Sequence, residues 1–88
     1  MKWFNTTKNT KKSKERYLYA VKHGDHAGKF LAYIKSDTTT HFFLSIPGNE
    51  KLEIPIADFN NGIDNKIVDF VEVLPRNVYK VIKAQYFA

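Results

Sequence analysis

The sequence predicts a mainly β protein, built as a small antiparallel sheet or barrel. Short runs of β-branched and aromatic residues alternate with turn clusters at intervals of about ten residues, which is typical of such folds. Within the runs, apolar side chains recur at every second position, so each run offers an apolar face to a core. The chain has 88 residues, 43% of them hydrophobic and 15% aromatic, which suits one small folded domain.

The alternation predicts four strands in the first part of the chain, over residues 16–22, 29–35, 40–46 and 51–56. In the first run, Tyr17, Tyr19 and Val21 share one face. The turn at residues 47–50 contains Pro and Gly, and it predicts that the third and fourth runs pair as a hairpin, because proline presets φ and glycine accepts positive φ. Pro55 in the fourth run indicates an edge strand, since proline cannot donate to a neighbouring strand.

The region after residue 62 fits two structures. Four apolar residues stand at the i, i+3, i+4 and i+7 spacing of a helix: Ile67, Phe70, Val71 and Leu74. Asp64 is placed to cap such a helix at its N-terminus. Because the run is short and rich in Val and Ile, we expect a strand. A helix near residues 64–74, which would make the fold α+β, is the alternative.

The remaining segments complete the expected architecture. We expect an irregular connection over residues 57–62 and a last strand over residues 77–87, following a turn at Pro75 and Arg76. A helix is again the alternative for residues 77–87. The fold would then contain five to six strands.

The charge distribution divides the chain into a flexible basic arm over residues 1–15 and a single small β-rich domain over residues 16–88. The first sixteen residues hold six basic residues against one acid, Glu15, and therefore account for the whole net charge of +5. Residues 17–88 hold eight basic and eight acidic residues. An arm of like charges interleaved with Asn, Thr and Ser buries too little apolar surface to become ordered, and it attracts polyanions.

The loop between the first two runs is similar to a known element. In residues 21–29, Gly24 and Gly28 are separated by three residues and lie between two strands, and Lys29 follows them. This segment resembles the KOW element of SH3-like barrels in ribosomal and transcription-elongation proteins. The resemblance implies an SH3-like antiparallel barrel that binds RNA, DNA or protein. The opening Lys-Trp-Phe-Asn, residues 2–5, matches the start of cold-shock domains, but the Gly-Phe-Gly-Phe segment of that family does not follow, so we interpret this match as coincidence.

These features predict a small non-enzymatic accessory protein that binds DNA or RNA. Twelve of the fourteen basic residues are Lys, a hydrated point charge suited to phosphates rather than to reading bases, so binding should be mostly sequence-neutral. The candidate nucleic-acid-binding residues are Lys8, Lys11, Lys12, Lys14 and Arg16 for phosphates, Lys29 as a continuation of this track, and Trp3 for stacking on bases. The alternative is a protein-interaction module or inhibitor, for example a host-modifying factor of viral or mobile-element origin.

The sequence gives less support to a metal-binding protein, an enzyme or a membrane protein. His23, Asp25, His26 and His41 are metal-ligand types, but they lack a fixed helical i, i+4 pair, so we expect ordinary loop residues, no metal and no cofactor. No nucleophile or second carboxylate is placed for catalysis. The chain has no Cys, which favours a reducing, cytoplasmic location. No apolar run approaches the roughly eighteen residues of a membrane span.

Overall fold

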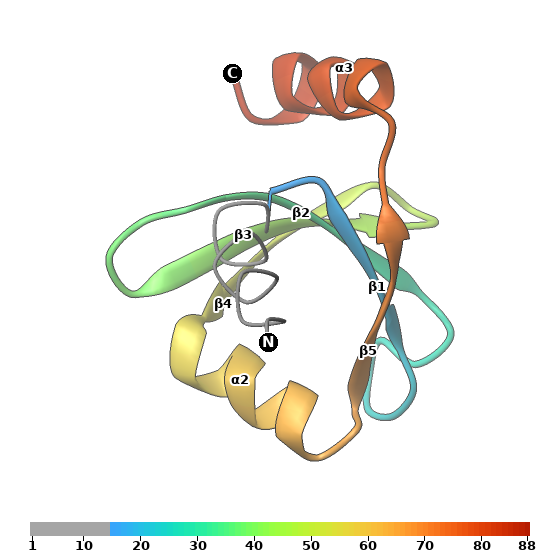
Figure 1. The fold of residues 1–88 in the computed structure, drawn as a ribbon, viewed down its shortest axis with the longest axis vertical. Helices are drawn as coiled ribbons and strands as arrows, with labels where there is room; N and C mark the ends of the chain where they lie inside the picture. The colour runs from blue at the N-terminus through green and yellow to red at the C-terminus, as the bar shows by residue number, and fades with distance from the viewer. Residues whose placement is uncertain (1–14) are drawn as a thin grey trace, which may run out of the picture.

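The computed structural model describes residues 15–88, which form one antiparallel sheet flanked by two helices (Figure 1). The elements in chain order are β1 (Tyr17–Val21), β2 (Phe30–Ser36), β3 (Thr40–Ile46), β4 (Glu50–Pro55), α2 (Ile56–Asp64), β5 (Val68–Val73) and α3 (Arg76–Tyr86). The mainly β class and the positions of the first four strands are confirmed.

The strand order is β4-β3-β2-β1-β5, so the first four strands form a meander and β5 returns to lie beside β1. The predicted hairpin of β3 and β4 is confirmed, with Phe43 opposite Leu52 and Gly48 at a φ of +102° in the turn. Pro55 ends β4, which is an edge strand as predicted. The sheet is not closed, however, and β4 and β5 are its two edges. The mainly β fold therefore lacks the closure expected of a barrel, because β4 and β5 do not pair with each other.

Two β-bulges curve the sheet. Leu18 pairs with Glu72 and Tyr19 pairs with Phe70, which leaves Val71 as an extra residue on β5. A similar register shift between β2 and β3 falls at Ile34. Bulges bend a strand and increase its twist. The sheet therefore arches over α2, with α3 on the opposite, convex side (Figure 1).

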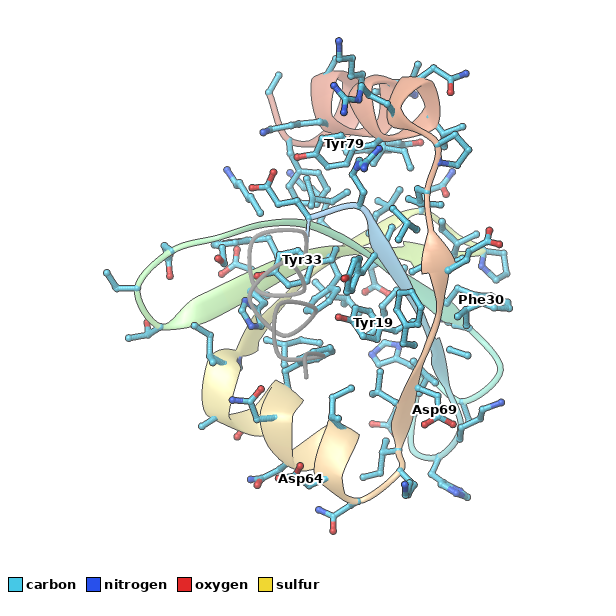
Figure 2. All side chains as sticks on the ribbon, viewed as in Figure 1. Tyr19, Phe30, Tyr33, Asp64, Asp69 and Tyr79 are labelled. Atoms are coloured by element: carbon cyan, nitrogen blue, oxygen red, sulfur yellow. The ribbon has the colours of Figure 1, made fainter. Side chains whose placement is uncertain are left out.

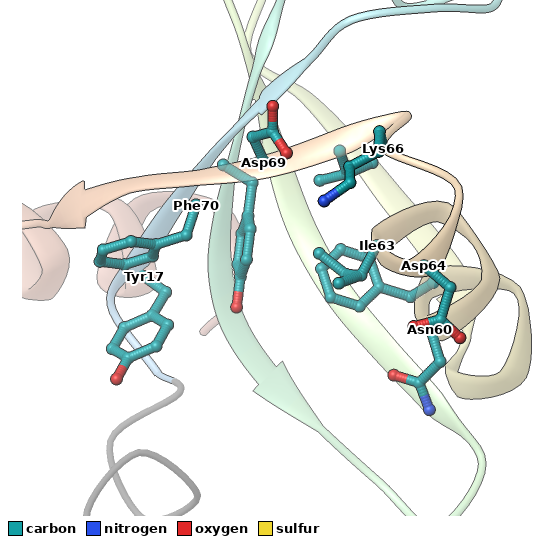
Figure 3. A pocket seen from close by; sticks show the side chains of 10 residues that line it. Tyr17, Asn60, Ile63, Asp64, Lys66, Asp69 and Phe70 are labelled. Carbon is teal, nitrogen blue, oxygen red and sulfur yellow. The ribbon is translucent and has the colours of Figure 1, made fainter. Parts of the chain in front are cut away.

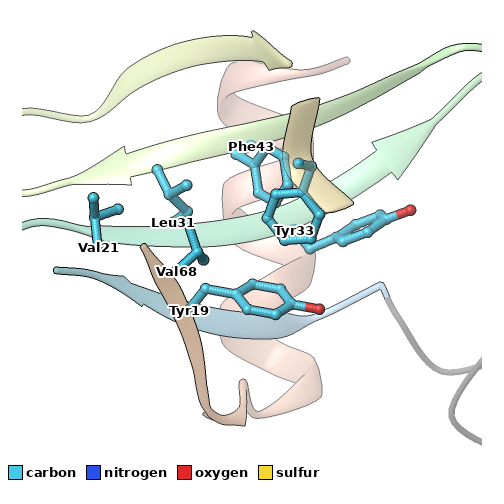
Figure 4. Packing of buried hydrophobic residues seen from close by; sticks show 7 residues of the cluster. Tyr19, Val21, Leu31, Tyr33, Phe43 and Val68 are labelled. Carbon is cyan, nitrogen blue, oxygen red and sulfur yellow. The ribbon is translucent and has the colours of Figure 1, made fainter. Parts of the chain in front are cut away.

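The concave face holds the larger core. Tyr19, Leu31, Tyr33 and Phe43 point from the strands toward α2, which contributes Phe59 (Figure 4). The rings of Phe43 and Phe59 pack with centroids 4.9 Å apart, so α2 is fixed by aromatic contacts. The core therefore lies between the arch of the sheet and α2.

The convex face has a second, smaller core under α3. Ala32, Ile34 and Leu44 lie on the sheet side, and Leu74 and Tyr79 cover them. The Tyr79 hydroxyl donates to the Ile34 carbonyl oxygen at 3.0 Å, and Figure 2 shows its ring between α3 and the sheet. Each face of the sheet is thus covered by one helix.

The helices correct two predictions. Residues 57–62, expected to be irregular, belong to α2, where Phe59 and Ile63 bury one side. Its three asparagine or glycine residues are weak helix formers and hide this pattern. Residues 77–87, expected to be a strand, are mostly α3, because Tyr79, Ile82 and Tyr86 recur at helical spacing toward the convex core.

The region after residue 62, which fits either a strand or a helix in the sequence, forms a strand. Residues 68–73 form β5, which confirms the preferred interpretation and excludes the helix near residues 64–74. Asp64 is the last residue of α2 rather than the cap of a following helix.

Candidate binding surfaces

The structure separates the two predicted phosphate-binding residues that it describes. Arg16 precedes β1, where its backbone N–H donates to the Tyr33 carbonyl oxygen at 2.9 Å. Lys29 lies beyond the other end, where its carbonyl oxygen accepts from the Val21 N–H at 2.9 Å. The five residues of β1 span about 17 Å, so Arg16 and Lys29 are not neighbours. The other predicted residues lie outside the described residues: Trp3, Lys8, Lys11, Lys12 and Lys14.

The loop between β1 and β2 has the backbone that its glycines favour. Gly24 and Gly28 have φ values of +95° and +88°, where side-chain-bearing residues are strained. The Gly28 N–H donates to the Val21 carbonyl oxygen at 2.9 Å and closes the loop. Similarity to the KOW element stays a prediction, because many tight loops share these φ values.

The metal-ligand types do not converge in residues 15–88. His41 is buried in the concave core, and its Nδ1 lies 2.9 Å from the Tyr33 hydroxyl. His23, Asp25 and His26 lie instead in the loop between β1 and β2. No group of three His, Cys, Asp or Glu residues with metal-binding geometry occurs in this described part of the chain.

The most exposed apolar surface of the sheet lies on β5. Phe70, Val71 and Val73 are 51%, 44% and 42% exposed, and Ile67 just before the strand is 36% exposed. Among the described residues, β5 has β1 as its single neighbour in the sheet, so its other edge is not paired with a strand. An apolar strand with an unpaired edge is a ready template for another strand.

An aromatic cleft of about 740 Å³ lies on the concave side, between β5 and α2. The rings of Tyr17 and Phe70 form one wall, with centroids 4.8 Å apart, and Figure 3 shows them side by side. Tyr19 and Phe59, 5.0 Å apart, form the floor. The cleft therefore continues the apolar surface of Phe70 into the interior of the fold.

The polar groups around this cleft are of mixed charge. Asn60 and Asp64 line it from α2, and Lys66 lines it from the turn before β5. Burial raises the pKa of Tyr19 to about 12, and the nearby Tyr17 and Tyr33 add to the rise. The Tyr19 hydroxyl therefore stays protonated at neutral pH and is available as a donor.

The two faces of β5 differ in chemistry. Phe70 and Val73 lie opposite Tyr19 and Tyr17, which places them on the concave face. Asp69 and Glu72 pair with Ala20 and Leu18 on the convex face. In Figure 3 the Asp69 carboxylate points away from the ring pair. The side chains of Phe70 and Val73 thus face the concave side and those of Asp69 and Glu72 the convex side, although Asp69 also belongs to the cleft lining.

Sequence reasoning did not identify this site. Tyr17 and Phe70 are far apart in the sequence, and only the pairing of β1 with β5 brings them together. One usable signal was present: the apolar residues Phe70, Val71 and Val73 break strict alternation, which is what a bulged, half-covered edge strand does.

No family model matches the sequence, and no curated protein or solved structure is significantly similar to the chain. No helix within residues 15–88 is long and apolar enough to cross a membrane.

Proposed function

We propose that the protein is a non-enzymatic protein-interaction module that binds an extended segment of a partner along the free edge of β5. The observation that carries this proposal is the concentration of exposed apolar side chains on a strand whose outer edge pairs with no strand of residues 15–88. Contiguous exposed apolar surface on a small protein marks an interaction site. An edge strand binds such a segment through backbone hydrogen bonds, with side-chain pockets adding specificity.

The two faces of β5 define the chemistry of the partner. A strand added beside Phe70 and Val73 would place alternate side chains over the aromatic cleft, where apolar groups are favoured. Its intervening side chains would face Asp69 and Glu72, where Lys or Arg is favoured by opposite charge. The expected partner segment is therefore amphipathic, with apolar residues alternating with basic ones.

A second copy of the same strand is a poorer occupant. In an antiparallel pair of two β5 strands centred between Phe70 and Val71, Asp69 would face Glu72 of the second copy. Like charges directly opposite each other destabilise a strand pair. Charge complementarity therefore favours a basic partner over self-association.

Two synthetic peptides test this proposal on the full chain, one of alternating Lys and Val and one of alternating Glu and Val. The Lys-Val peptide is expected to bind and to slow amide hydrogen exchange in residues 67–73, whereas the Glu-Val peptide is not. Val73→Lys should weaken binding about tenfold, because it adds a like charge and removes apolar contact. Val81→Lys is the matched control, since Val81 is 61% exposed on α3, away from β5.

Three results would contradict the proposal. One is equal binding of the two peptides. Another is equal weakening by Val73→Lys and Val81→Lys. The third is concentration-dependent association of the chain alone with slowed exchange in β5, which would assign the edge to a second copy.

A second candidate function, nucleic-acid binding by the arm, rests on the charge distribution. Residues 15–88 hold nine basic and nine acidic residues, so the net charge of +5 belongs to residues 1–14. A segment with five excess cations neutralises several phosphates and gives salt-dependent, sequence-neutral affinity. The body contributes no net attraction of its own.

A gel-shift titration over a salt series, with single-stranded and duplex probes, tests this second function. Replacing Lys8, Lys11, Lys12 and Lys14 together by Gln should flatten the plot of log affinity against log salt by about three to four units of slope. Lys80→Gln, on α3, is the control and should change little. Absence of binding by the unaltered chain at low salt would exclude this function.

A further inference from the structure

A second cavity opens at the other end of the concave face, below the loop between β1 and β2. It has a volume of about 350 Å³ and lies between that loop, β4 and α2. Ligand-binding cavities for small molecules begin near this size. Phe59 lines both this cavity and the aromatic cleft, so one ring forms the wall between them.

The lower part of this cavity is apolar. Leu31 and Val21 line it from the sheet and are 2% and 7% exposed. Leu52 and Ile54 line it from β4 and are half-buried. A ligand that fills this part would remove apolar surface from water, at roughly 25 cal/mol for each Å².

His26 lines the polar part of the cavity. Its Nδ1 is shielded from solvent and has no hydrogen-bond partner among the described residues. A nitrogen without accessible surface does not meet a ligand in the cavity, so the exposed polar groups of the lining determine the chemistry of the ligand.

The charges at the rim select the ligand further. Asp25 from the loop and Asp58 from α2 line the cavity, and no Lys or Arg of residues 15–88 belongs to its lining. Two carboxylates repel phosphates and carboxylates and attract a cation. The other titratable residues in the lining are His23 and His26.

We propose that this cavity binds a small organic amine, with its apolar body against Leu31, Leu52 and Ile54 and its ammonium group at the rim. The ammonium donates to the carboxylates of Asp25 and Asp58. This inference does not rest on strand addition at β5, because the residues assigned to the ligand, Asp25, Asp58, Leu52 and Ile54, do not line the aromatic cleft.

Three probes of nearly equal size test the proposal: benzylamine, benzyl alcohol and benzoate. Each is titrated into the full chain while the backbone amide resonances are followed by NMR. Benzylamine is expected to bind about three- to fivefold more tightly than benzyl alcohol, because both rim carboxylates are exposed and their attraction is screened by water. Benzoate should not bind. The resonances that shift should be those of residues 23–26, 52–54 and 58–62.

Three variants separate the contributions. Asp58→Asn should reduce the preference for the amine over the alcohol, because Asp25 alone then attracts the ammonium, while leaving alcohol binding intact. Leu52→Phe should weaken all the probes by occupying the apolar part, and its amide spectrum reports whether the fold is kept. Glu53→Gln is the matched control, because Glu53 lies on the opposite face of β4 from Leu52 and Ile54 and should change nothing.

The proposal is overturned if benzoate binds as tightly as benzylamine, if the shifts map to residues outside this cavity, or if no probe binds. It is also overturned if Asp58→Asn leaves the amine preference unchanged. Peptide binding at β5 would be unaffected by any of these outcomes, so the two proposals fail separately.

Discussion

Replacing Tyr79 by Phe tests whether one hydroxyl holds α3 against the convex face of the sheet. The ring of Tyr79 is 8% exposed, and its hydroxyl lies 3.0 Å from the Ile34 carbonyl oxygen and 2.9 Å from Oε1 of Glu15. The substitution removes the hydroxyl and keeps the ring. The convex core beneath α3 therefore loses a polar contact but keeps its apolar packing.

The two acceptors set the size of the effect. A hydrogen bond to a neutral carbonyl contributes about 0.5–1.5 kcal/mol, and removing its donor leaves a buried oxygen less well satisfied. The Glu15 carboxylate is a stronger acceptor, but Glu15 is exposed and its contribution is screened by water. Because one proton serves both acceptors, we expect a total loss of about 1–2 kcal/mol.

Urea unfolding followed by far-ultraviolet circular dichroism measures this loss. With an m-value of about 1–3 kcal/mol per molar urea, the midpoint should fall by about 0.5–1 M. Tyr86→Phe is the matched control on the same helix, since the Tyr86 hydroxyl has only a long 3.5 Å contact with Gln85. If Tyr79→Phe and Tyr86→Phe change the free energy of unfolding equally, the hydroxyl of Tyr79 does not fasten α3.

Four further predictions concern the concave core and the backbone. Burial raises the pKa of Tyr19 from about 10 to about 12, so between these pH values the folded state keeps the hydroxyl proton that the unfolded state has lost. The free energy of unfolding should therefore fall as the pH rises from about 10 to about 12. Tyr19→Phe should reduce this fall, which urea titrations at each pH would measure. Phe43→Ala should lower the free energy of unfolding by about 3–5 kcal/mol, because the side chain is fully buried; a loss below 1 kcal/mol in the same measurement would contradict the packing described. Gly62→Ala should raise the melting temperature through a gain of about 0.5–1 kcal/mol in helix propensity, since its new Cβ would meet Val68 at an ordinary 3.4 Å. Gly28→Ala should lower the melting temperature through about 1–2 kcal/mol of backbone strain at its φ of +88°, and equal effects of the two glycine substitutions would contradict this distinction.

The strands were predictable because their signals are local. Alternation of Leu52, Ile54 and their polar neighbours, and the Pro-Gly turn before them, determine β3 and β4 without knowledge of the rest of the chain. The same holds for β5, whose Val-rich composition outweighed a helical spacing of four apolar residues.

The helices were not predictable from such local signals. α2 contains weak helix formers, and α3 contains Val78 and Val81, which favour strands when read alone. Both helices are stabilised by tertiary contacts, through Phe59 under the arch and Tyr79 over the convex face. Without the helices, closing the sheet into a barrel was the simplest way to bury one of its faces and to pair its edge strands.

The binding surfaces were the least predictable part of the molecule. The aromatic cleft depends on β5 lying beside β1, and the second cavity depends on α2 lying below the loop that contains His26. These contacts join residues that are remote in sequence, and no local motif encodes them. The charge separation between the arm and the body, by contrast, needs no structure at all.

Because of where the aromatic residues lie, one fluorescence titration can report on both candidate functions through separate tryptophan and tyrosine signals. All five tyrosines lie in the described part of the chain, and Tyr19, Tyr33 and Tyr79 are buried in its two cores. The single tryptophan, Trp3, belongs to the basic arm. Indole emission therefore reports on what the arm meets, while tyrosine emission reports on the folded body. A nucleic acid that binds the arm would change the first signal, and a peptide that seats beside Tyr17 would change the second.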